Sequence, residues 1–171
     1  FLKLINEEVK VDYIFSNAGN FFYNIGKIDI AQKLQEHALK LNPKNVNAFN
    51  QIGMCHSNRG QDDEAIKYYK DAMKIDPNHK KTYKNIANSY RNLQNFKEAV
   101  KFYDKSDEIL DKCQQLECYY MMGDYENFYK KLNILSENYP PHPLAASLSK
   151  HASIRFDQED NYSFCSNPFD F

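Results

Sequence analysis

The sequence predicts an all-α fold, a right-handed α-solenoid of antiparallel helix pairs, from three observations. Apolar residues recur at helical spacing along the chain, while the alternating pattern typical of strands is scarce. Glycine and proline are few, five and six respectively. Two helix-ending signals, Asn42-Pro43 and Asp76-Pro77, recur with a 34-residue period, which is typical of helix-turn-helix repeats.

Composition and charge exclude several classes of protein. The chain carries 22 Lys and Arg against 23 Asp and Glu, so it lacks the basic excess that nucleic-acid binding requires. A hydrophobic fraction of 42% is too high for a wholly disordered chain. Because no long apolar run occurs, we expect no membrane span and no membrane partner.

The cysteines and the N-terminus bear on the cellular compartment. Cys55, Cys113, Cys118 and Cys165 are too few and too irregularly placed for a disulfide framework, so we expect free thiols. No secretory signal is visible, which predicts a cytoplasmic protein. The first residue is Phe1 rather than Met, which suggests a fragment of a longer protein.

The 34-residue period also holds for the small residues. Ala31, Ala65 and Ala99 share this spacing, as do Gly26 and Gly60. Unrelated helices of similar length would not place these residue types in a common phase. The period predicts three repeats, at residues 12–45, 46–79 and 80–112.

Large and small residues alternate within each repeat in a recurring order. The pattern comprises Phe15, Ala18-Gly19, Phe22, Ala31 and Pro43 in the first repeat, Phe49, Ile52-Gly53, His56, Ala65, Tyr69 and Pro77 in the second, and Tyr83, Ile86-Ala87, Tyr90, Ala99 and Tyr103 in the third. It resembles the tetratricopeptide repeat family, although Asp111 stands where the third proline belongs. Small residues let paired helices approach closely, and stacking of repeats supplies the core.

The pattern weakens outside the three repeats. Gly123-Asp124-Tyr125 matches the family's inter-helix turn, but Phe128 follows Ala99 five positions too early for the period, so we expect a degenerate fourth repeat at 113–140 with a shortened first helix. Residues 141–156 predict a capping helix with Pro143 in its first turn. Residues 1–11 are interpreted as a partial preceding helix or N-terminal cap, and residues 157–171 as an acidic aromatic tail or the start of a missing region.

No catalytic or metal-binding motif is present in the sequence. The five histidines form neither His-x-Asp nor His-Glu-x-x-His, and no Cys-x-x-Cys, glycine-rich phosphate loop or Gly-x-Ser-x-Gly occurs. We therefore expect no enzymatic activity within these residues, no cofactor and no metal.

The resemblance implies that the first helix of each repeat lines a concave groove, and 18 positions follow from it. Nine of them are Asn. A carboxamide donates and accepts hydrogen bonds, so a row of them can bind the main chain of an extended peptide, as in the asparagine ladder of O-linked N-acetylglucosamine transferases, which the arrangement resembles. A merely hydrophilic face is the open alternative. The expected peptide-binding residues are Asn17, Asn20, Asn24, Asn50, Gln51, Asn58, Lys81, Lys84, Asn85, Asn88, Arg91 and Asn92.

Two further features bear on the peptide. The carboxylate clamp of co-chaperones is matched at Asn20 and Lys81 but not at Ser16 or Asn85, which argues against capture of a terminal carboxylate. Residues 80–105 hold seven Lys and Arg against Glu98 and Asp104, so an acidic segment could be steered there. A solvated charged face is the alternative interpretation.

These observations lead to three hypotheses. The first is a protein-protein interaction scaffold that binds an extended, acidic or neutral peptide in an Asn-lined groove. The second is an N-terminal interaction arm of a larger enzyme, such as a glycosyltransferase, a sulfotransferase or a 2-oxoglutarate-dependent oxygenase, suggested by the unfinished end at residues 167–171. The third is self-association through uncapped ends.

Overall fold

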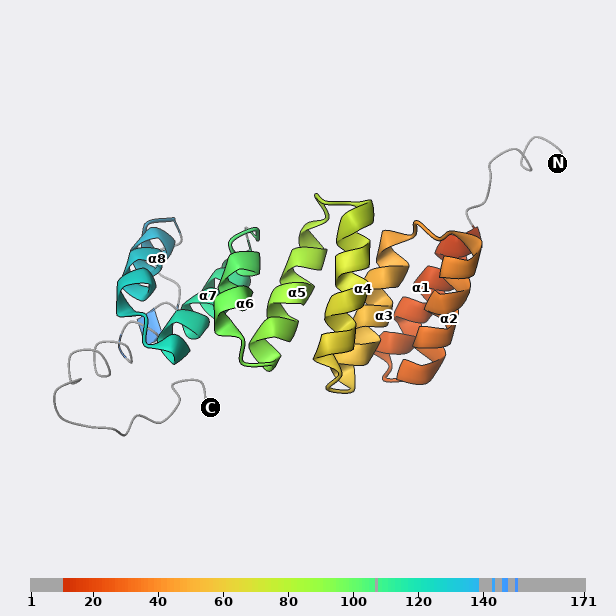
Figure 1. The fold of residues 1–171 in the computed structure, drawn as a ribbon, viewed down its shortest axis with the longest axis horizontal. Helices are drawn as coiled ribbons and strands as arrows, with labels where there is room; N and C mark the ends of the chain where they lie inside the picture. Colours follow the sequence, from red (N-terminus) through yellow and green to blue (C-terminus); the bar gives the residue numbers. More distant parts are fainter. Residues whose placement is uncertain (1–10, 107, 139–142, 144–145, 148–149, 151–171) are drawn as a thin grey trace. The chain divides into compact units, whose positions relative to one another are not determined.

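The computed structural model describes residues 11–106, 108–138, 143, 146–147 and 150. This part of the chain forms eight helices and no strand (Figure 1), which confirms the predicted all-α helical repeat. The helices are α1 (Val11–Asn24), α2 (Ile28–Leu41), α3 (Val46–Asn58), α4 (Asp62–Ile75), α5 (Lys80–Asn92), α6 (Phe96–Tyr103), α7 (Ile109–Met122) and α8 (Tyr125–Asn138).

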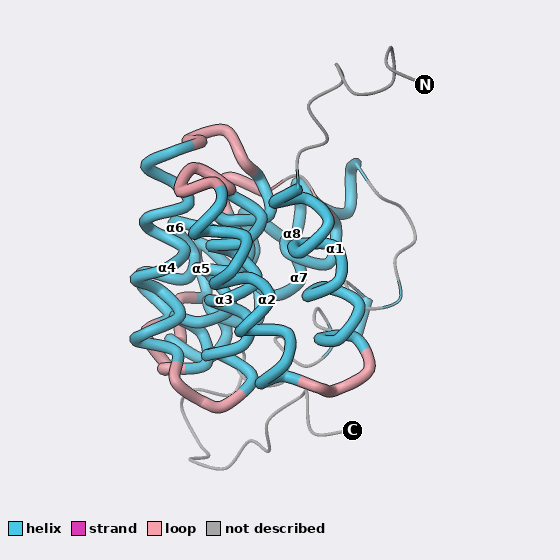
Figure 2. Tube along the Cα trace, turned by 90° about the vertical axis from the view of Figure 1, so that its right-hand side faces the viewer, coloured by secondary structure: helices cyan, strands magenta, loops and turns pink. Residues whose placement is uncertain are grey.

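The helices belong to two compact units. Unit 1 spans residues 1–93 and contains α1 to α5, and unit 2 spans residues 94–171 and contains α6 to α8. In unit 1 each helix packs on the next along the chain, and α3 also contacts both α1 and α5. In unit 2, α6 packs on α7 and α7 packs on α8. The tube in Figure 2 shows short loops between the helices.

Two glycines set how closely the paired helices of unit 1 approach. A Cβ atom on Gly53 of α3 would lie 2.4 Å from Cε1 of Tyr69 on α4, and one on Gly19 of α1 would lie 2.5 Å from Nε2 of Gln35 on α2. On the second helices the small buried residues are Ala31, Ala38, Ala65 and Ala72. The small residues therefore have the packing role that the sequence predicts.

The turns of unit 1 repeat with the same 34-residue phase. Gly26 and Gly60, which follow α1 and α3, adopt φ of 78° and 73°, a left-handed conformation that glycine tolerates best. Helices α2 and α4 are followed by the C-cap residues Asn42 and Asp76, whose extended backbone is what the next residues, both prolines, require. In the third turn Gln94 takes the equivalent position and is the one described non-glycine residue with a positive φ, 57°.

The five-residue loss of register before the fourth repeat lies in a different helix from the one that the sequence predicts. We expected a shortened first helix in that repeat, but α7 has 14 residues. It is α6 that is short, with 8 residues where α2 and α4 have 14. Helix α6 ends where Asp104 begins a turn, and buried Ser106 then donates a hydrogen bond to Asp111 in the first turn of α7. The prediction of a shortened α7 was therefore wrong.

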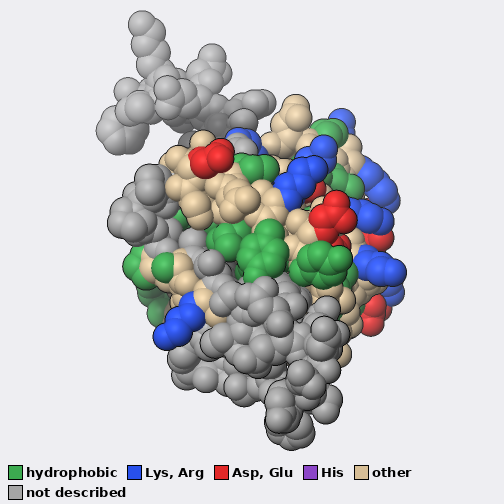
Figure 3. All heavy atoms as spheres, turned by 90° about the vertical axis from the view of Figure 1, so that its left-hand side faces the viewer, with side chains coloured by type: hydrophobic (Ala, Val, Ile, Leu, Met, Phe, Trp, Pro, Cys, Tyr) green, Lys and Arg blue, Asp and Glu red, His purple; other side chains and the backbone are tan. Residues whose placement is uncertain are grey.

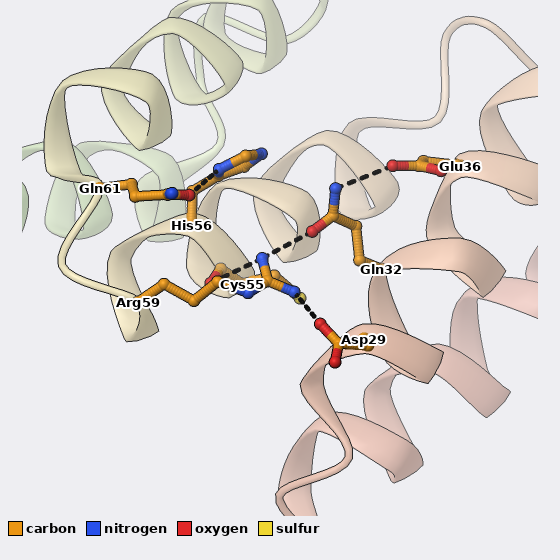
Figure 4. Close-up of polar contacts among 7 residues, drawn as sticks. All are labelled: Asp29, Gln32, Glu36, Cys55, His56, Arg59 and Gln61. Carbon is orange, nitrogen blue, oxygen red and sulfur yellow. Dashed lines mark hydrogen bonds and ion pairs between the residues drawn. The ribbon is translucent and has the colours of Figure 1, made fainter.

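Polar contacts join the first repeat to the second (Figure 4). The Arg59 guanidinium, just after α3, donates to Oδ1 of Asp29 and to Oε1 of Gln32, both at 2.7 Å, and both residues lie on α2. Within the first repeat, Asn42 and Asn45 each donate to Asp12 Oδ2 at 2.9 Å. These hydrogen bonds, from Asn42 and then from Asn45, lower the pKa of Asp12.

The end of unit 2 agrees with the sequence where the structure describes it. Gly123 ends α7 with φ of 70°, α8 follows at Tyr125, and Phe128, Leu132 and Leu135 are buried. Figure 3 shows hydrophobic side chains on the surface of the molecule on the side of α8. The predicted elements at 1–11, 141–156 and 157–171 fall almost entirely outside the described residues.

Cysteines and membrane-spanning potential complete the description. Cys55, Cys113 and Cys118 are buried as thiols rather than in disulfides, as predicted, and burial raises the pKa of Cys55 to about 11. Cys165 lies outside the described residues. Within the described chain, every helix is too short or too polar to cross a lipid bilayer.

Candidate functional site

The carboxamides predicted from the sequence meet on the first helices of unit 1. Because α3 contacts both α1 and α5, polar side chains on these three helices lie within reach of one another. Gln51 Nε2 donates to Asn20 Oδ1 at 3.2 Å, which links α3 to α1. Asn85 Nδ2 donates to Asn50 Oδ1 at 3.4 Å, which links α5 to α3. We call Asn20, Gln51, Asn58, Asn85 and Asn88 the amide surface.

A pocket of about 210 Å³ opens within this surface, and all its lining residues belong to unit 1. Helix α1 contributes one lining residue, α3 three, α4 one and α5 two. None of these side chains carries a charge at neutral pH. The lining residues are Tyr23, Met54, Ser57, Asn58, Tyr69, Asn85 and Asn88.

Two phenols give the pocket aromatic walls with polar tips. Burial raises the pKa of Tyr23 and of Tyr69, so both hydroxyls stay protonated at physiological pH and keep their ability to donate. A hydrogen bond from Asn58 partly opposes the rise in the pKa of Tyr23. Tyr69 is buried against Gly53, so its ring has a fixed place. The pocket therefore combines a rigid aromatic wall with amide donors and acceptors.

A buried carboxylate lies behind the lining residue Ser57. Asp62, the first residue of α4, accepts a hydrogen bond from Ser57 Oγ at 2.7 Å. Asn92 Nδ2 on α5 lies 3.3 Å from both Asp62 carboxylate oxygens. These contacts hold Ser57 and Asn92 in place and join α3, α4 and α5.

Asn50 differs from the other predicted site residues because it is buried. Its amide nitrogen donates to Val46 O at 3.0 Å and to Thr82 Oγ1 at 2.9 Å, and lies 3.5 Å from His79 Nδ1. Its oxygen accepts from Asn85. With these partners on α3 and α5, Asn50 joins two repeats, and its hydrogen bonds are made within the protein.

The remaining predicted residues are distributed around the pocket. Asn58, Asn85 and Asn88 line it, and Asn20 and Gln51 extend the amide surface toward α1. Asn92 contacts Asp62 beside it. The other five do not line the pocket; Asn17, Asn24 and Lys81 are exposed, and Lys84 and Arg91 are half-buried.

The expected binding residues lack several contributors to this site. Tyr23, Met54 and Ser57 are among the 18 expected groove positions but not among the expected binding residues, and Tyr69 and Asp62 are in neither set. Tyr69 was interpreted as a packing aromatic, yet the same ring that covers Gly53 also forms a wall of the pocket. Asp62 was not singled out, and its burial on the first turn of a charged helix has no signal in the sequence. The 34-residue phase places Tyr69 in register with Gln35 and Tyr103, and this register carries no sign that Tyr69 lines a pocket.

The chemistry that the site offers is hydrogen bonding and shape. The described residues contain no group of three or more His, Cys, Asp or Glu side chains able to hold a metal ion. The amides and phenols of the pocket can donate to a peptide carbonyl and accept from a peptide N–H. Such groups bind neutral polar or apolar ligands without a fixed charge.

Comparison with known families finds the same family, the tetratricopeptide repeat, at each matched stretch. Models described as tetratricopeptide repeat match residues 13–45, 46–79 and 81–110, which together make up more than half of the chain. The matched ranges agree with the three repeats read from the sequence. No curated protein sequence matches the chain.

Solved structures resemble the chain in fold at low sequence identity. A crystal structure of YrrB, described as a TPR protein with an unusual peptide-binding site, has a TM-score of 0.72 at 15% identity, with 94% of this chain and 85% of YrrB covered. PilF of Pseudomonas aeruginosa has a TM-score of 0.64 at 14% identity, with 81% and 66% covered. A double mutant of MamA from RS-1 has a TM-score of 0.76 at 13% identity, with 86% and 85% covered.

Proposed function

Because the chain belongs to the tetratricopeptide repeat family, we propose that it is a protein-protein interaction scaffold whose amide surface binds an extended peptide. The observation that carries the proposal is the pocket, which is lined by seven uncharged side chains from four helices. A scaffold role accords with the family, whose repeats present surfaces rather than catalytic groups.

The pocket supports selection of one neutral side chain of the peptide. Its volume of about 210 Å³ suits a side chain and not a whole ligand. Met54 and the Tyr69 ring offer apolar contact, and a charged side chain entering there would lose hydration without gaining a counter-ion. We therefore expect a leucine-sized or aromatic residue at the central position of the peptide.

The carboxamides around the pocket support recognition of the peptide main chain. Asn58, Asn85 and Asn88 line the pocket, and each carboxamide has two N–H donors and an acceptor oxygen, of which Asn85 uses one N–H on Asn50. An extended peptide repeats its N–H and C=O groups along its length, so amides on neighbouring helices can pair with successive peptide units. Asn50 has no part in this contact, since its hydrogen bonds are made within the protein.

The charges on α1, α3 and α5 favour a peptide that is acidic at one end only. Helix α3 contains no Asp, Glu, Lys or Arg, and α1 contains only Asp12, which is buried. Helix α5 contains Lys80, Lys81, Lys84 and Arg91 and no acidic residue. A peptide that is neutral over α1 and α3 and acidic over α5 would match this distribution.

The likeness to YrrB also supports a peptide as the ligand class. YrrB is described as having an unusual peptide-binding site, and its chain and ours share the fold over most of their lengths. An arm of a larger enzyme would use the same surface in the same way, so the enzyme-arm hypothesis remains a prediction from the sequence. The cytoplasmic location is likewise a prediction from the sequence.

The test uses an array of synthetic extended peptides with Leu, Phe, Asn, Glu or Lys at the centre and neutral or acidic flanks. We expect binding of peptides with a central Leu or Phe and an acidic flank, measured by fluorescence anisotropy on the full chain. The triple change Asn58→Ala, Asn85→Ala and Asn88→Ala should weaken that binding on the order of tenfold or more. Added salt should weaken it further where the flank is acidic.

The matched control is Asn133→Ala, an exposed asparagine on α8 in unit 2. It should leave peptide affinity unchanged, and circular dichroism should show both variants folded. Equal affinity for the triple variant and the wild type would remove the amide surface from the proposal. A preference for central Glu or Lys would remove the neutral pocket.

A further inference from the structure

Helix α1 and the residue after it carry an apolar stripe that the described part of the chain leaves exposed. Val11, Ile14, Ala18, Phe21 and Ile25 follow one another at spacings of three and four, the pattern of a seam between two helices. The four large members are between 48% and 59% exposed. The residues that α1 buries within unit 1 are others, namely Asp12, Ser16 and Gly19. We call the five apolar residues the α1 seam.

Repeat register shows that this surface is normally an interface. Ile14 and Phe21 correspond, one repeat later, to Ala48 and Cys55 of α3, which are both 0% exposed. Helix α3 packs on α2 of the preceding repeat, and the charges of Asp29 and Glu36 on α2 influence Cys55. The α1 seam is therefore the first-repeat counterpart of a face that the preceding helix pair covers in the second repeat.

The residue sizes indicate that the α1 seam takes a different partner from α3. Ala48 and Cys55 are small, which lets α2 approach α3 closely. Ile14 and Phe21 are large and would hold a helix placed as α2 is on α3 farther away. A covering helix must therefore reach across this wider spacing with large side chains of its own opposite Ile14 and Phe21.

The α1 seam of a second, antiparallel copy of the chain meets this requirement. Counted from Ala18, Val11 and Ile25 lie seven positions to either side, and Ile14 and Phe21 lie four before and three after. In an antiparallel pair about a two-fold axis at Ala18, Ile14 faces Phe21 of the second copy and Val11 faces Ile25. The two Ala18 residues lie at the centre, on the two-fold axis itself.

Charge also permits two copies to meet on this face. Asp12 is the one charged residue of α1, and it is buried and bound by Asn42 and Asn45. Neither copy therefore presents a charge on the seam that would repel its own image. A neutral, self-complementary stripe is what a two-fold interface requires, since the same surface serves both partners.

We propose that this chain forms a two-fold dimer through the α1 seam, with the two α1 helices antiparallel. One helix pair buries less than the roughly 1,200 Å² of a stable specific interface, so the dimer exchanges with monomer and is not obligate. The seam shares no residue with the amide surface, and the peptide-binding proposal stands or falls separately.

Sedimentation equilibrium on the full chain, from low to high micromolar concentration, tests the dimer. The wild type should shift from monomer mass to dimer mass and stop there. The double variant Ile14→Gln and Phe21→Gln should weaken association on the order of tenfold or more, because it places two amides in the seam. The control Ile134→Gln, on an exposed isoleucine of α8, should associate as the wild type does.

A cysteine at the proposed axis gives a geometric readout. Ala18→Cys should form a disulfide between two copies under mild oxidation, since the two side chains face each other, and Lys33→Cys on the exposed face of α2 should not. The double variant should keep its circular dichroism spectrum and its peptide affinity. Monomer mass at every concentration, growth past dimer, undiminished association of the double variant, or equal crosslinking at Lys33 would each overturn the proposal.

Discussion

The first and second repeats of unit 1 share one register but differ in how equivalent positions are filled. Gly53 faces the Tyr69 ring, whereas Gly19 faces the unbranched Gln35 side chain, which is also buried and donates to Ser16 O at 2.8 Å. Asn50 joins α3 to α5 through its side chain, whereas the equivalent residue of the first repeat is the shorter Ser16. The comparison shows that the same helix-pair geometry is built on the Tyr69 ring in the second repeat and on the buried Gln35 carboxamide in the first.

The largest expected effect is at the two close-packed glycines. Gly53→Ala should lower the free energy of unfolding by about 2 to 3 kcal/mol, because the new methyl overlaps a buried ring that cannot move aside. Gly19→Ala should lower it by less, about 1 to 2 kcal/mol, since the end of the Gln35 side chain can shift more easily than a ring, although it gives up its hydrogen bond to Ser16 O. Urea unfolding of both variants measures the difference, and equal losses would contradict a softer first repeat.

The next largest effect concerns the buried side chain of Asn50. Asn50→Ala should lower the free energy of unfolding by about 2 kcal/mol, because Thr82 and Val46 lose a partner in a buried place. Ser16→Ala, at the equivalent position of the first repeat, should change it by no more than about 0.5 kcal/mol. Chemical denaturation compares them, and similar values would show that Asn50 does not hold the repeats together.

The turns sharpen the comparison with opposite signs. Gly60→Ala should lower the free energy of unfolding by about 1 kcal/mol, since φ is 73° there although the Cβ would meet nothing within 4 Å. Gln94→Gly should raise it by about 0.5 kcal/mol, because glycine accepts the left-handed backbone more easily, which outweighs its greater freedom when unfolded. Thermal melts report both, and destabilisation by Gln94→Gly would mean that its side chain has a packing role.

The smallest expected effect is at the exposed ion pair between the first two repeats. A double-mutant cycle of Asp29→Ala and Arg59→Ala should give a coupling of about 0.5 kcal/mol, because the Asp29 side chain is 87% exposed. The coupling should fall as salt is added. A coupling well above about 1 kcal/mol, unaffected by salt, would assign this contact a larger share in joining the repeats.

The sequence alone predicted the parts of this molecule that depend on periodicity. The 34-residue phase located three repeats, their inter-helix turns and the small residues that let helices approach. It could not locate the shortening in α6, because a lost stretch of five residues leaves the same downstream register wherever it occurs between Ala99 and Phe128.

For the candidate site, the residue types were predictable and their burial was not. The carboxamides follow from the first helices of each repeat, but Asn50 looks the same in sequence as Asn85 or Asn88. Only the three-dimensional arrangement shows that Thr82 and Val46 engage Asn50 while the other two line a pocket. Tyr69 contributes a wall because Gly53 leaves room for its ring, a relation between residues on different helices.

The buried thiol of Cys55 makes the junction between the first two repeats open to kinetic study. With 0% exposure and a pKa of about 11, the group is neither accessible nor ionised in the native molecule. Alkylation can then proceed only while α3 separates from α2, so the labelling rate reports how often that junction opens. Unlike global denaturation, this labelling measurement is made under native conditions and reports on a single junction between repeats.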